Sequence, residues 1–286
     1  MQILINILEQ GLIFSIAALG VYITYKILDF PDLSVDGTFP LGAAVAAACI
    51  VRGINPFFAS ALALISGCLG GLITGILHVK FKITNLMSGI LVMIGLYSVN
   101  LRIMTKANIP LFGTSTVFSE GIEPLIIISA FFVIVKLILD LFLNTKLGFL
   151  LKAAGDNEQL VTSLGVSKNR VKIIGLMLSN GFVALSGAIM AQQQGFADIG
   201  MGTGIVVMGL AAVILGESIL KRVKVIKLST KVVFGAVIYK AVVALALQVG
   251  LEPTDLKLIT ALIVVAALAL NNSSISFKAF KKAKFS

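Results

Sequence analysis

Charge is scarce in this chain of 286 residues: only 13% of the residues are charged, whereas 58% are hydrophobic. A typical soluble domain is about 25% charged and about 45–50% apolar. One water-soluble core cannot hide so many apolar side chains behind so few charged ones. The composition therefore argues against a soluble enzyme and a disordered chain, and it indicates an integral membrane protein with several helices.

Residues that bind metals or build disulfide frameworks are also rare. The chain has one histidine, His78, and two cysteines, Cys49 and Cys68, which lie in separate apolar stretches. We therefore expect no disulfide and no metal site. The motifs GxxxxGK[ST], HExxH, GxSxG and GxGxxG are absent from the sequence. These absences indicate a conduit and not an enzyme, with no cofactor of its own.

The charges that are present give a formal net charge of +10 and gather in short basic clusters between apolar runs. A nucleic-acid-binding protein would carry its basic residues on a solvated face, whereas the cytoplasmic loops of membrane proteins collect lysine and arginine. We therefore expect contact with membrane lipid and none with nucleic acid. The clusters are Lys80 and Lys82; Lys146 and Lys152; Lys168, Arg170 and Lys172; Lys221, Arg222, Lys224 and Lys227; and Lys278, Lys281, Lys282 and Lys284.

Apolar segments recur along the whole chain, and a helix that crosses a bilayer needs about 20 apolar residues. Because open sheets cannot cross lipid, we expect an all-α polytopic membrane protein, a single domain over residues 1–286, with eight to ten transmembrane helices. The segments without any Asp, Glu, Lys or Arg are 53–77, 83–101, 173–197 and 258–277, and those that are shorter or carry one or two charges are 10–25, 39–51, 122–143, 199–216 and 231–250.

The basic clusters orient the second half of the chain. If residues 144–172 are cytoplasmic, then Gln194–Met201 and Gly250–Asp255 are outer loops, and residues 221–229 and the basic tail 273–286 lie inside. All clusters then share the cytoplasmic side of the cell membrane, as the positive-inside rule requires. In the first half, the side of the N-terminus stays open.

Small residues recur at helix-packing intervals in two segments. Gly67, Gly71 and Gly75 lie four residues apart, and so do Gly187, Ala191 and Gly195. A stripe of small residues lets helix backbones approach closely in lipid. We expect these stripes to pack helices within one subunit, with a subunit–subunit interface as the alternative.

The polar insertion 144–172 contains signals for a short separate helix. We expect a helix over Leu147–Ala154 to stop at Gly155 in the left-handed conformation. Asp156 can then cap a second helix, with Gln159 completing a capping box. That helix ends at Gly165, and Ser167 begins the next one. On its buried side we expect Leu160, Val161 and Leu164.

Two interpretations of this short helix remain open. It can be a knob that docks into a groove on a soluble partner and transmits motion. Alternatively, it can lie on the lipid headgroups as an amphipathic surface helix. The residues alone do not separate these interpretations.

This region resembles the permease subunits of ATP-binding-cassette importers of the branched-chain amino acid and ribose type. The likeness is carried by Gly148–Glu217, and earlier by Asp32–Ala47, DLSVDGTFPLGAAVAA. Asn85–Met104 and Gln194–Gly204 are most similar to the subfamily associated with tryptophan and tyrosine. Asp36 departs from the sugar-type members, which have glycine there, and this argues against a sugar-only assignment.

The resemblance implies a permease that imports a small polar solute, an aromatic or branched-chain amino acid, into a bacterial cell. It implies three partners: an ATPase subunit that binds ATP and Mg, a second permease subunit in a homo- or heterodimer, and an extracytoplasmic solute-binding protein. The residues it assigns to ATPase coupling are Ala153, Ala154, Gly155, Asp156, Asn157, Leu160, Leu164 and Gly165. The alternatives are an ion- or proton-coupled secondary transporter and a channel or structural membrane protein.

Polar residues between 29 and 40 point to a path through the membrane. Prolines, a glycine and three aspartates interrupt this stretch, and a broken helix is tolerated in lipid only beside protein or a wet cavity. We therefore expect a broken or re-entrant element, with an ordinary exposed loop as the alternative. The candidate path residues are Ser34, Asp36, Gly37 and Thr38, joined by Asn85, Ser88, Tyr97 and Asn100 from the segment 83–101.

Two further residues are candidates for contact with the external binding protein. Arg102 follows the outer end of the segment 83–101, where it can meet a carboxylate or extend to the lipid headgroups. Asp198 lies in the loop expected outside the membrane.

Overall fold

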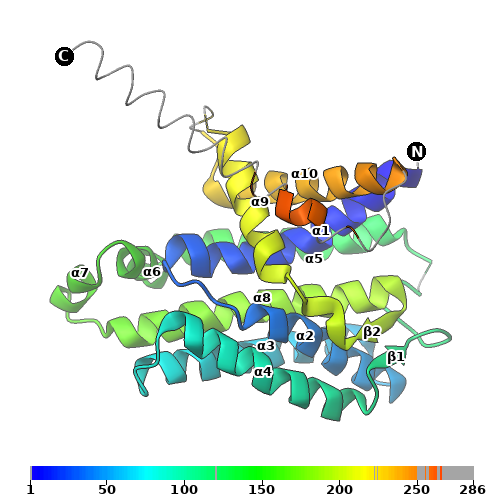
Figure 1. Ribbon diagram of the computed structural model, residues 1–286, viewed down its shortest axis with the longest axis horizontal. Helices are drawn as coiled ribbons and strands as arrows, with labels where there is room; N and C mark the ends of the chain where they lie inside the picture. Colours follow the sequence, from blue (N-terminus) through cyan, green and yellow to red (C-terminus); the bar gives the residue numbers. More distant parts are fainter. Residues whose placement is uncertain are drawn as a thin grey trace.

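The computed structural model describes residues 2–119, 121–221, 223, 225–249, 255, 258–262 and 265 (Figure 1). Its described part is mostly helical, with one short two-stranded sheet, which confirms the predicted all-α class. The elements are α1 (Gln2–Tyr22), the π-helical turn η1 (Ile23–Ile27), α2 (Val35–Val51), α3 (Pro56–Val79), α4 (Asn85–Met104), β1 (Asn108–Pro110), α5 (Pro124–Leu143), α6 (Lys146–Asp156), α7 (Glu158–Ser163), α8 (Lys168–Gln194), β2 (Phe196–Asp198), the 3-10 turn η2 (Ile199–Gly202), α9 (Ile205–Ile219) and α10 (Leu228–Gln248).

Seven helical segments of the described chain are long and apolar enough to cross a membrane, and α2, with 17 residues, is a shorter apolar helix. Together they meet the lower end of the predicted range. The predicted segment 258–277 lies mostly outside the described residues, and so do most of the loop Gly250–Asp255 and the whole of the basic tail 273–286.

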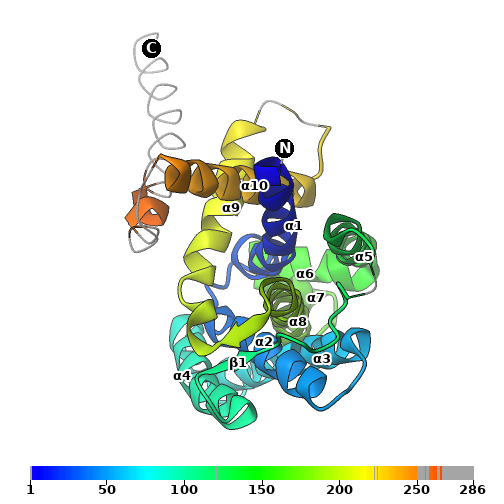
Figure 2. The ribbon, with the colours of Figure 1, turned by 90° about the vertical axis from the view of Figure 1, so that its right-hand side faces the viewer.

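The bundle is built around α8, which packs against α3, α2 and α1 (Figure 2). Its middle is buried on all sides, as at Val183, Ala184 and Ile189. The predicted small-residue packing is confirmed: a Cβ at Gly67 or Gly71 would collide with the backbone of α8. These glycines therefore set the distance between α3 and α8.

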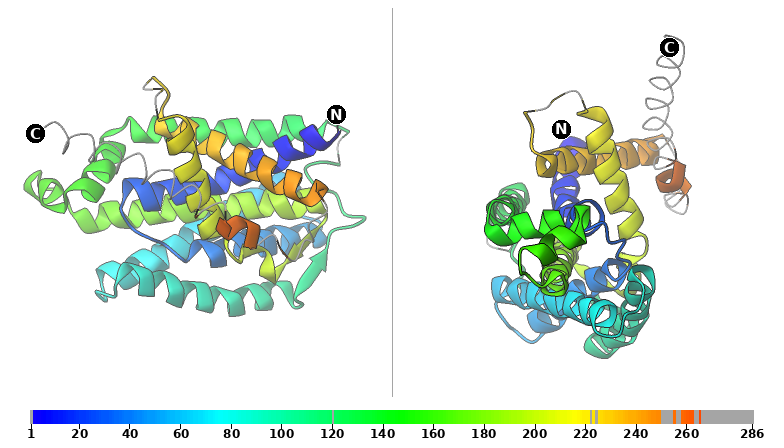
Figure 3. Two further views of the ribbon diagram at one scale, coloured as in Figure 1. Left: turned by 45° about the horizontal axis from the view of Figure 1, so that its top comes forward. Right: turned by 90° about the vertical axis from the view of Figure 1, so that its left-hand side faces the viewer.

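The two ends of the bundle differ. One end carries α6 and α7 and is called the coupling end; the other carries the antiparallel pair β1–β2 and is called the hairpin end (Figures 1 and 3). At the coupling end, ion pairs join elements that are far apart in the sequence: Lys26 with Glu217 at 2.9 Å, and Lys227 with Asp140 at 3.3 Å. The N-terminus lies at the hairpin end (Figure 1), so it is on the side opposite to the basic loops.

The predicted broken element at 29–40 is shorter than expected. The interruption covers only Leu28–Ser34, and α2 begins at Val35, so Asp36, Gly37 and Thr38 are helical. Pro40 lies inside α2, where it cannot donate a hydrogen bond to the carbonyl of Asp36. That carbonyl lies against Gly202 of η2, so packing from another element accommodates the proline within a helix.

Candidate functional site

The interruption before α2 is held by a buried hydrogen-bond network. Asp32 is 4% exposed, and its carboxylate accepts from the backbone N–H of Ser34 at 2.8 Å and from the Ser34 hydroxyl at 2.6 Å. The other carboxylate oxygen accepts from Asn180 Nδ2 of α8 at 2.9 Å. Buried polar groups must be paired in this way, so the network fixes the break against the central helix.

Asn180 extends the same network to α2. Its Oδ1 accepts from the Thr38 hydroxyl at 2.8 Å and lies 3.1 Å from Ser34 Oγ. Ser34 and Thr38, both predicted to border a path, are fully buried within this network and are not among the residues that line the cavity described below. Neither Asp32 nor Asn180 was predicted as an anchor; the available signal was an amide in the middle of the uncharged segment 173–197.

Asp36 has a different role from its neighbours. Its two carboxylate oxygens accept from the backbone N–H groups of Gly204 at 3.0 Å and Val206 at 2.8 Å. A carboxylate at a helix N-terminus satisfies unpaired donors and is favoured by the helix dipole. Asp36 of α2 therefore caps α9, and it joins the first interruption of the chain to a second one at 199–204.

A cavity of about 540 Å³ lies beside this junction, between α2, α4 and η2. Four of the predicted path residues line it: Asp36, Gly37, Tyr97 and Asn100. Asn100 is buried and donates from Nδ2 to the carbonyl of Gly37 at 3.2 Å, whereas its Oδ1 has no partner among the described residues. Thr203 and Gly200, from the second interruption, also line the cavity and were not predicted. We call this cavity the groove.

Asn85 and Ser88 are not part of the groove. They lie at the coupling end of α4, about 18 Å along the helix from Tyr97 and Asn100 at 1.5 Å per residue. The Ser88 hydroxyl donates to the carbonyl of Thr84 at 2.9 Å. Three-residue spacing places the two residues of each pair on one face of α4. The pair Asn85 and Ser88 nevertheless lies at a different position along the helix axis from the pair Tyr97 and Asn100.

Arg102 and Asp198 both lie toward the hairpin end. Arg102 is exposed in the last turn of α4. Asp198 belongs to β2, accepts from the backbone N–H of Gly200 at 2.7 Å, and lies 3.4 Å from Asn108 Nδ2 of β1. Arg102 is exposed and Asp198 is partly exposed at this end, and their contact with a binding protein stays a prediction.

The predicted capping of the coupling segment is wrong in two details. Gly155 does not stop the helix, because α6 continues to Asp156. A Cβ at Gly155 would collide with the backbone of Ile27, so this glycine is needed for close packing of α6 on η1. The second cap is Asn157, not Asp156: its Oδ1 accepts from the N–H groups of Gln159 at 2.9 Å and Leu160 at 3.3 Å.

The next helix, α7, presents apolar side chains outward. Val161 is fully buried, but Leu160 is 47% exposed and Leu164, just after the helix, is 56% exposed. The expected burial of these two leucines is therefore wrong. Gly165 has φ +73° and ends the segment as predicted, Ala153 and Ala154 are buried in the core, and Ser167 is the N-cap of α8.

An acidic side chain fixes α7 to the start of α8. Glu158 pairs with Lys168 at 2.6 Å and also with Lys172. Hydrogen bonds from Lys168 and then Lys172 lower the pKa of Glu158 from 4.5 to about 2. The carboxylate is therefore ionised at neutral pH, and α7 is held in one orientation despite its short length.

These features define a polytopic helical membrane protein with two joined helix interruptions beside a groove and a fixed apolar projection at one end. The family model described as "Branched-chain amino acid transport system / permease component" matches residues 3–269. The chain belongs to this family. It is a permease of the kind found in ATP-binding-cassette importers, and a multi-pass protein of a bacterial cell membrane.

Individual relatives agree with this assignment. The chain is 51% identical over 275 residues to a tyrosine transport system permease protein of Clostridioides difficile (strain R20291), covering 96% of this chain and 93% of the relative. It is 38% identical to the uncharacterized protein RP368 of Rickettsia prowazekii (strain Madrid E), covering 94% and 98%. It is 29% identical to the ribose import permease protein RbsC of Escherichia coli (strain K12), covering 74% and 68%. No solved structure matches the chain.

Proposed function

We propose that this permease imports an aromatic amino acid, with tyrosine as the first candidate. The similarity to a tyrosine transport permease over nearly the full length of both chains supports this substrate class. The ribose permease is more distant, in agreement with the departure at Asp36 from the sugar-type members.

The observation that carries the transport mechanism is the pair of exposed leucines on a fixed helix. Leu160 and Leu164 project at the coupling end, while Asn157 caps α7 and Glu158 holds it to α8. An apolar helix face of this kind fits a groove on a soluble partner. The proposed partner is a separate ATPase subunit, which binds ATP and Mg and supplies the energy.

Force applied to α7 has two packed routes into the membrane. One runs through the ion pairs of Glu158 into α8, and from Asn180 to Asp32 and α2. The other runs through α6, whose Gly155 lies against η1 at the end of α1. Because α2 caps α9 through Asp36, movement of α8 is transmitted to both walls of the groove.

In this proposal, the groove of one chain forms one half of the translocation path. It opens at the surface of one chain, beside the exposed Tyr97, and a second permease subunit, identical or related, would complete the enclosure. An external binding protein delivers the solute at the hairpin end, where Arg102 and Asp198 are placed. Rocking of the two subunits around this path corresponds to alternating access.

Reconstituted uptake of labelled tyrosine, with the ATPase and binding protein present, tests this proposal. Leu160→Asp together with Leu164→Asp is expected to reduce ATP-driven uptake at least tenfold. The matched control is Val225→Asp, since Val225 is 94% exposed and lies between α9 and α10. Uptake that resists vanadate and collapses with an ionophore would favour the secondary-transporter alternative and refute the proposal.

A further inference from the structure

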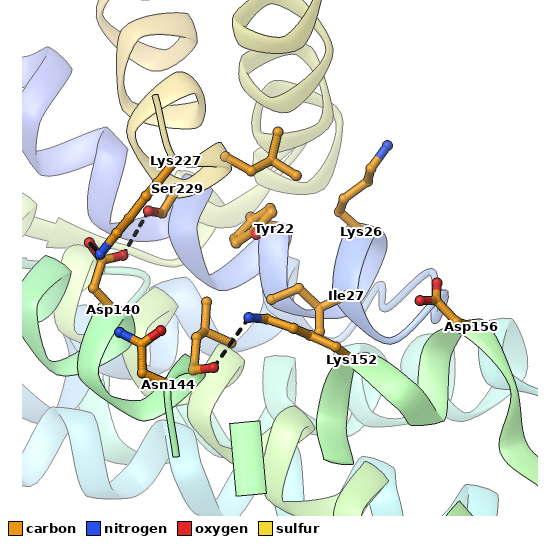
Figure 4. A pocket seen from close by; sticks show the side chains of 11 residues that line it. Tyr22, Lys26, Ile27, Asp140, Asn144, Lys152, Asp156, Lys227 and Ser229 are labelled. Carbon is orange, nitrogen blue, oxygen red and sulfur yellow. Dashed lines mark hydrogen bonds and ion pairs between the residues drawn. The ribbon is translucent and has the colours of Figure 1, made fainter. Parts of the chain in front are cut away.

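A second cavity, of about 430 Å³, lies at the coupling end and is distinct from the groove (Figure 4). Four parts of the chain border it: the end of α1 with η1, the end of α5, α6, and the start of α10. We call it the basal cavity. It is separate from α7, but α6 forms one of its walls.

Positive charge in the basal cavity is only partly neutralised. Asp140 is shared by Lys136 at 2.9 Å and Lys227 at 3.3 Å, and it also accepts from the Ser229 hydroxyl at 2.7 Å. Lys152 forms no ion pair with any described residue, and its ammonium donates to the backbone carbonyl of Leu143 at 3.2 Å. Asp156, one turn further along α6, does not pair with it either. Lys152 therefore retains N–H donors for an anion.

A second donor lines the same cavity. Tyr22 is 5% exposed and is one of the lining residues (Figure 4). No described residue forms a hydrogen bond with its hydroxyl, which is therefore free to donate to a group that enters the cavity. An anionic group that accepts from both Lys152 and Tyr22 would satisfy both donors.

The surroundings of the cavity indicate which molecule carries that group. Helices α5 and α10 each pack against α1 (Figure 2), and they meet each other at their coupling ends, where Asp140 of α5 bonds to Lys227 and Ser229 at the start of α10. Both helices carry exposed apolar side chains, among them Val133 and Leu137 on α5 and Phe234 on α10. The basal cavity lies between these coupling ends. A molecule with an anionic head and an apolar chain matches both parts.

We propose that the basal cavity binds the headgroup phosphate of an anionic phospholipid from the cytoplasmic leaflet, with an acyl chain against the exposed apolar side chains of α5 or α10. Basic pockets between helices on the cytoplasmic side suit such headgroups, and charge-assisted bonds to phosphate are strong. Because Lys152 belongs to α6, the bound lipid steadies the coupling segment. The site does not depend on which solute the permease moves.

Native mass spectrometry of the complete transporter, released from nanodiscs of phosphatidylglycerol and phosphatidylcholine, tests this site. The wild-type complex is expected to retain phosphatidylglycerol in preference to phosphatidylcholine. Lys152→Met should weaken that retention about tenfold, and Tyr22→Phe about threefold, since both remove one hydrogen bond and only the first removes a charge. Lys146→Met, on the same helix but outside the cavity, is the matched control and should retain the lipid fully.

Three results would overturn the proposal. Equal retention of the two lipids would show that the headgroup charge is not recognised. Equal loss in the Lys146→Met control would show a general effect of surface charge. Displacement of phosphatidylglycerol by free tyrosine would assign the cavity to the solute. None of these results depends on uptake, so failure here is distinct from failure of the proposed transport function.

Discussion

The centre of the bundle and the coupling segment use polar residues for opposite purposes. At the centre, Asp32 and Asn180 are buried and fully paired, and glycines bring α3 and α2 against α8. At the coupling end, Leu160 and Leu164 are apolar yet exposed, and the polar residues Asn157 and Glu158 hold them in place. The centre is organised for packing within the chain, whereas α7 is organised for a partner.

The largest loss of stability is expected at one of the tightest helix contacts. A Cβ at Gly42 would collide with the backbone of Ala184, so Gly42→Val must push α2 away from α8. We expect a loss of about 3 kcal/mol or more, measured as a drop in the thermal unfolding temperature of the detergent-solubilised protein. Gly53→Ala, at a position with open space around it, should cost less despite its left-handed backbone.

The next largest effect is expected from Asp32→Ala. This change leaves the Ser34 and Asn180 donors buried without an acceptor, which costs about 3 kcal/mol. Asp32→Asn restores one acceptor and should recover part of the loss in the same unfolding assay. If both variants unfold like the wild type, the network is not what fixes the interruption.

Asp36→Ala is expected to lower the stability less than Asp32→Ala does, but to reduce transport severely. Loss of a helix cap costs about 1–2 kcal/mol, and α9 would lose its fixed start beside the groove. We expect the variant to assemble but to show little uptake of labelled tyrosine. Normal uptake by an assembled Asp36→Ala variant would remove Asp36 from the transport mechanism.

At the coupling end, a substitution should reduce function without reducing the stability of the fold. Leu160→Asp changes an exposed side chain, so the free energy of unfolding should stay within about 0.5 kcal/mol of the wild type. Tyrosine-stimulated ATPase activity of the reconstituted transporter should nevertheless fall about tenfold. A large loss of stability would instead show that Leu160 packs within the chain, and the contrast between the two regions would fail.

The smallest effect concerns the pH dependence of α7. The pKa of Glu158 is lowered from 4.5 to about 2 by Lys168 and Lys172. A lowered carboxyl pKa stabilises the folded state above about pH 4.5, and this contribution is lost as the pH falls toward 2. A spin label at Gln159 should therefore gain mobility only between about pH 4.5 and pH 2, whereas Glu158→Gln should show this mobility at all pH values.

Much of the fold could be predicted from the sequence because lipid imposes strict rules on segment length and charge. The helices, the interruption before α2 and the glycine contacts of α3 followed from those rules. The cap at Asn157 and the role of Gly155 did not, because both depend on how closely α6 approaches η1.

The groove was harder to predict than the helices. Asp36 and Gly37 were identified from helix-breaking residues, but their contact with 199–204 joins positions about 168 residues apart in the chain. Ser34 and Thr38 look like path residues by type, and only the position of Asn180 shows that they are anchors. Spacing along one helix predicts a shared face, but it does not predict which other element lies opposite.

The central claim is that α7 transmits the force of a separate ATPase, and crosslinking at Leu164→Cys tests it most directly. In the reconstituted transporter, this cysteine should crosslink to the ATPase subunit, with a yield that changes between the nucleotide-free and ATP-bound states. In sealed vesicles whose outside corresponds to the cell exterior, this cysteine should not react with a membrane-impermeant reagent added to the outside. Labelling from the outside, or crosslinks to phospholipid alone throughout turnover, would contradict the account.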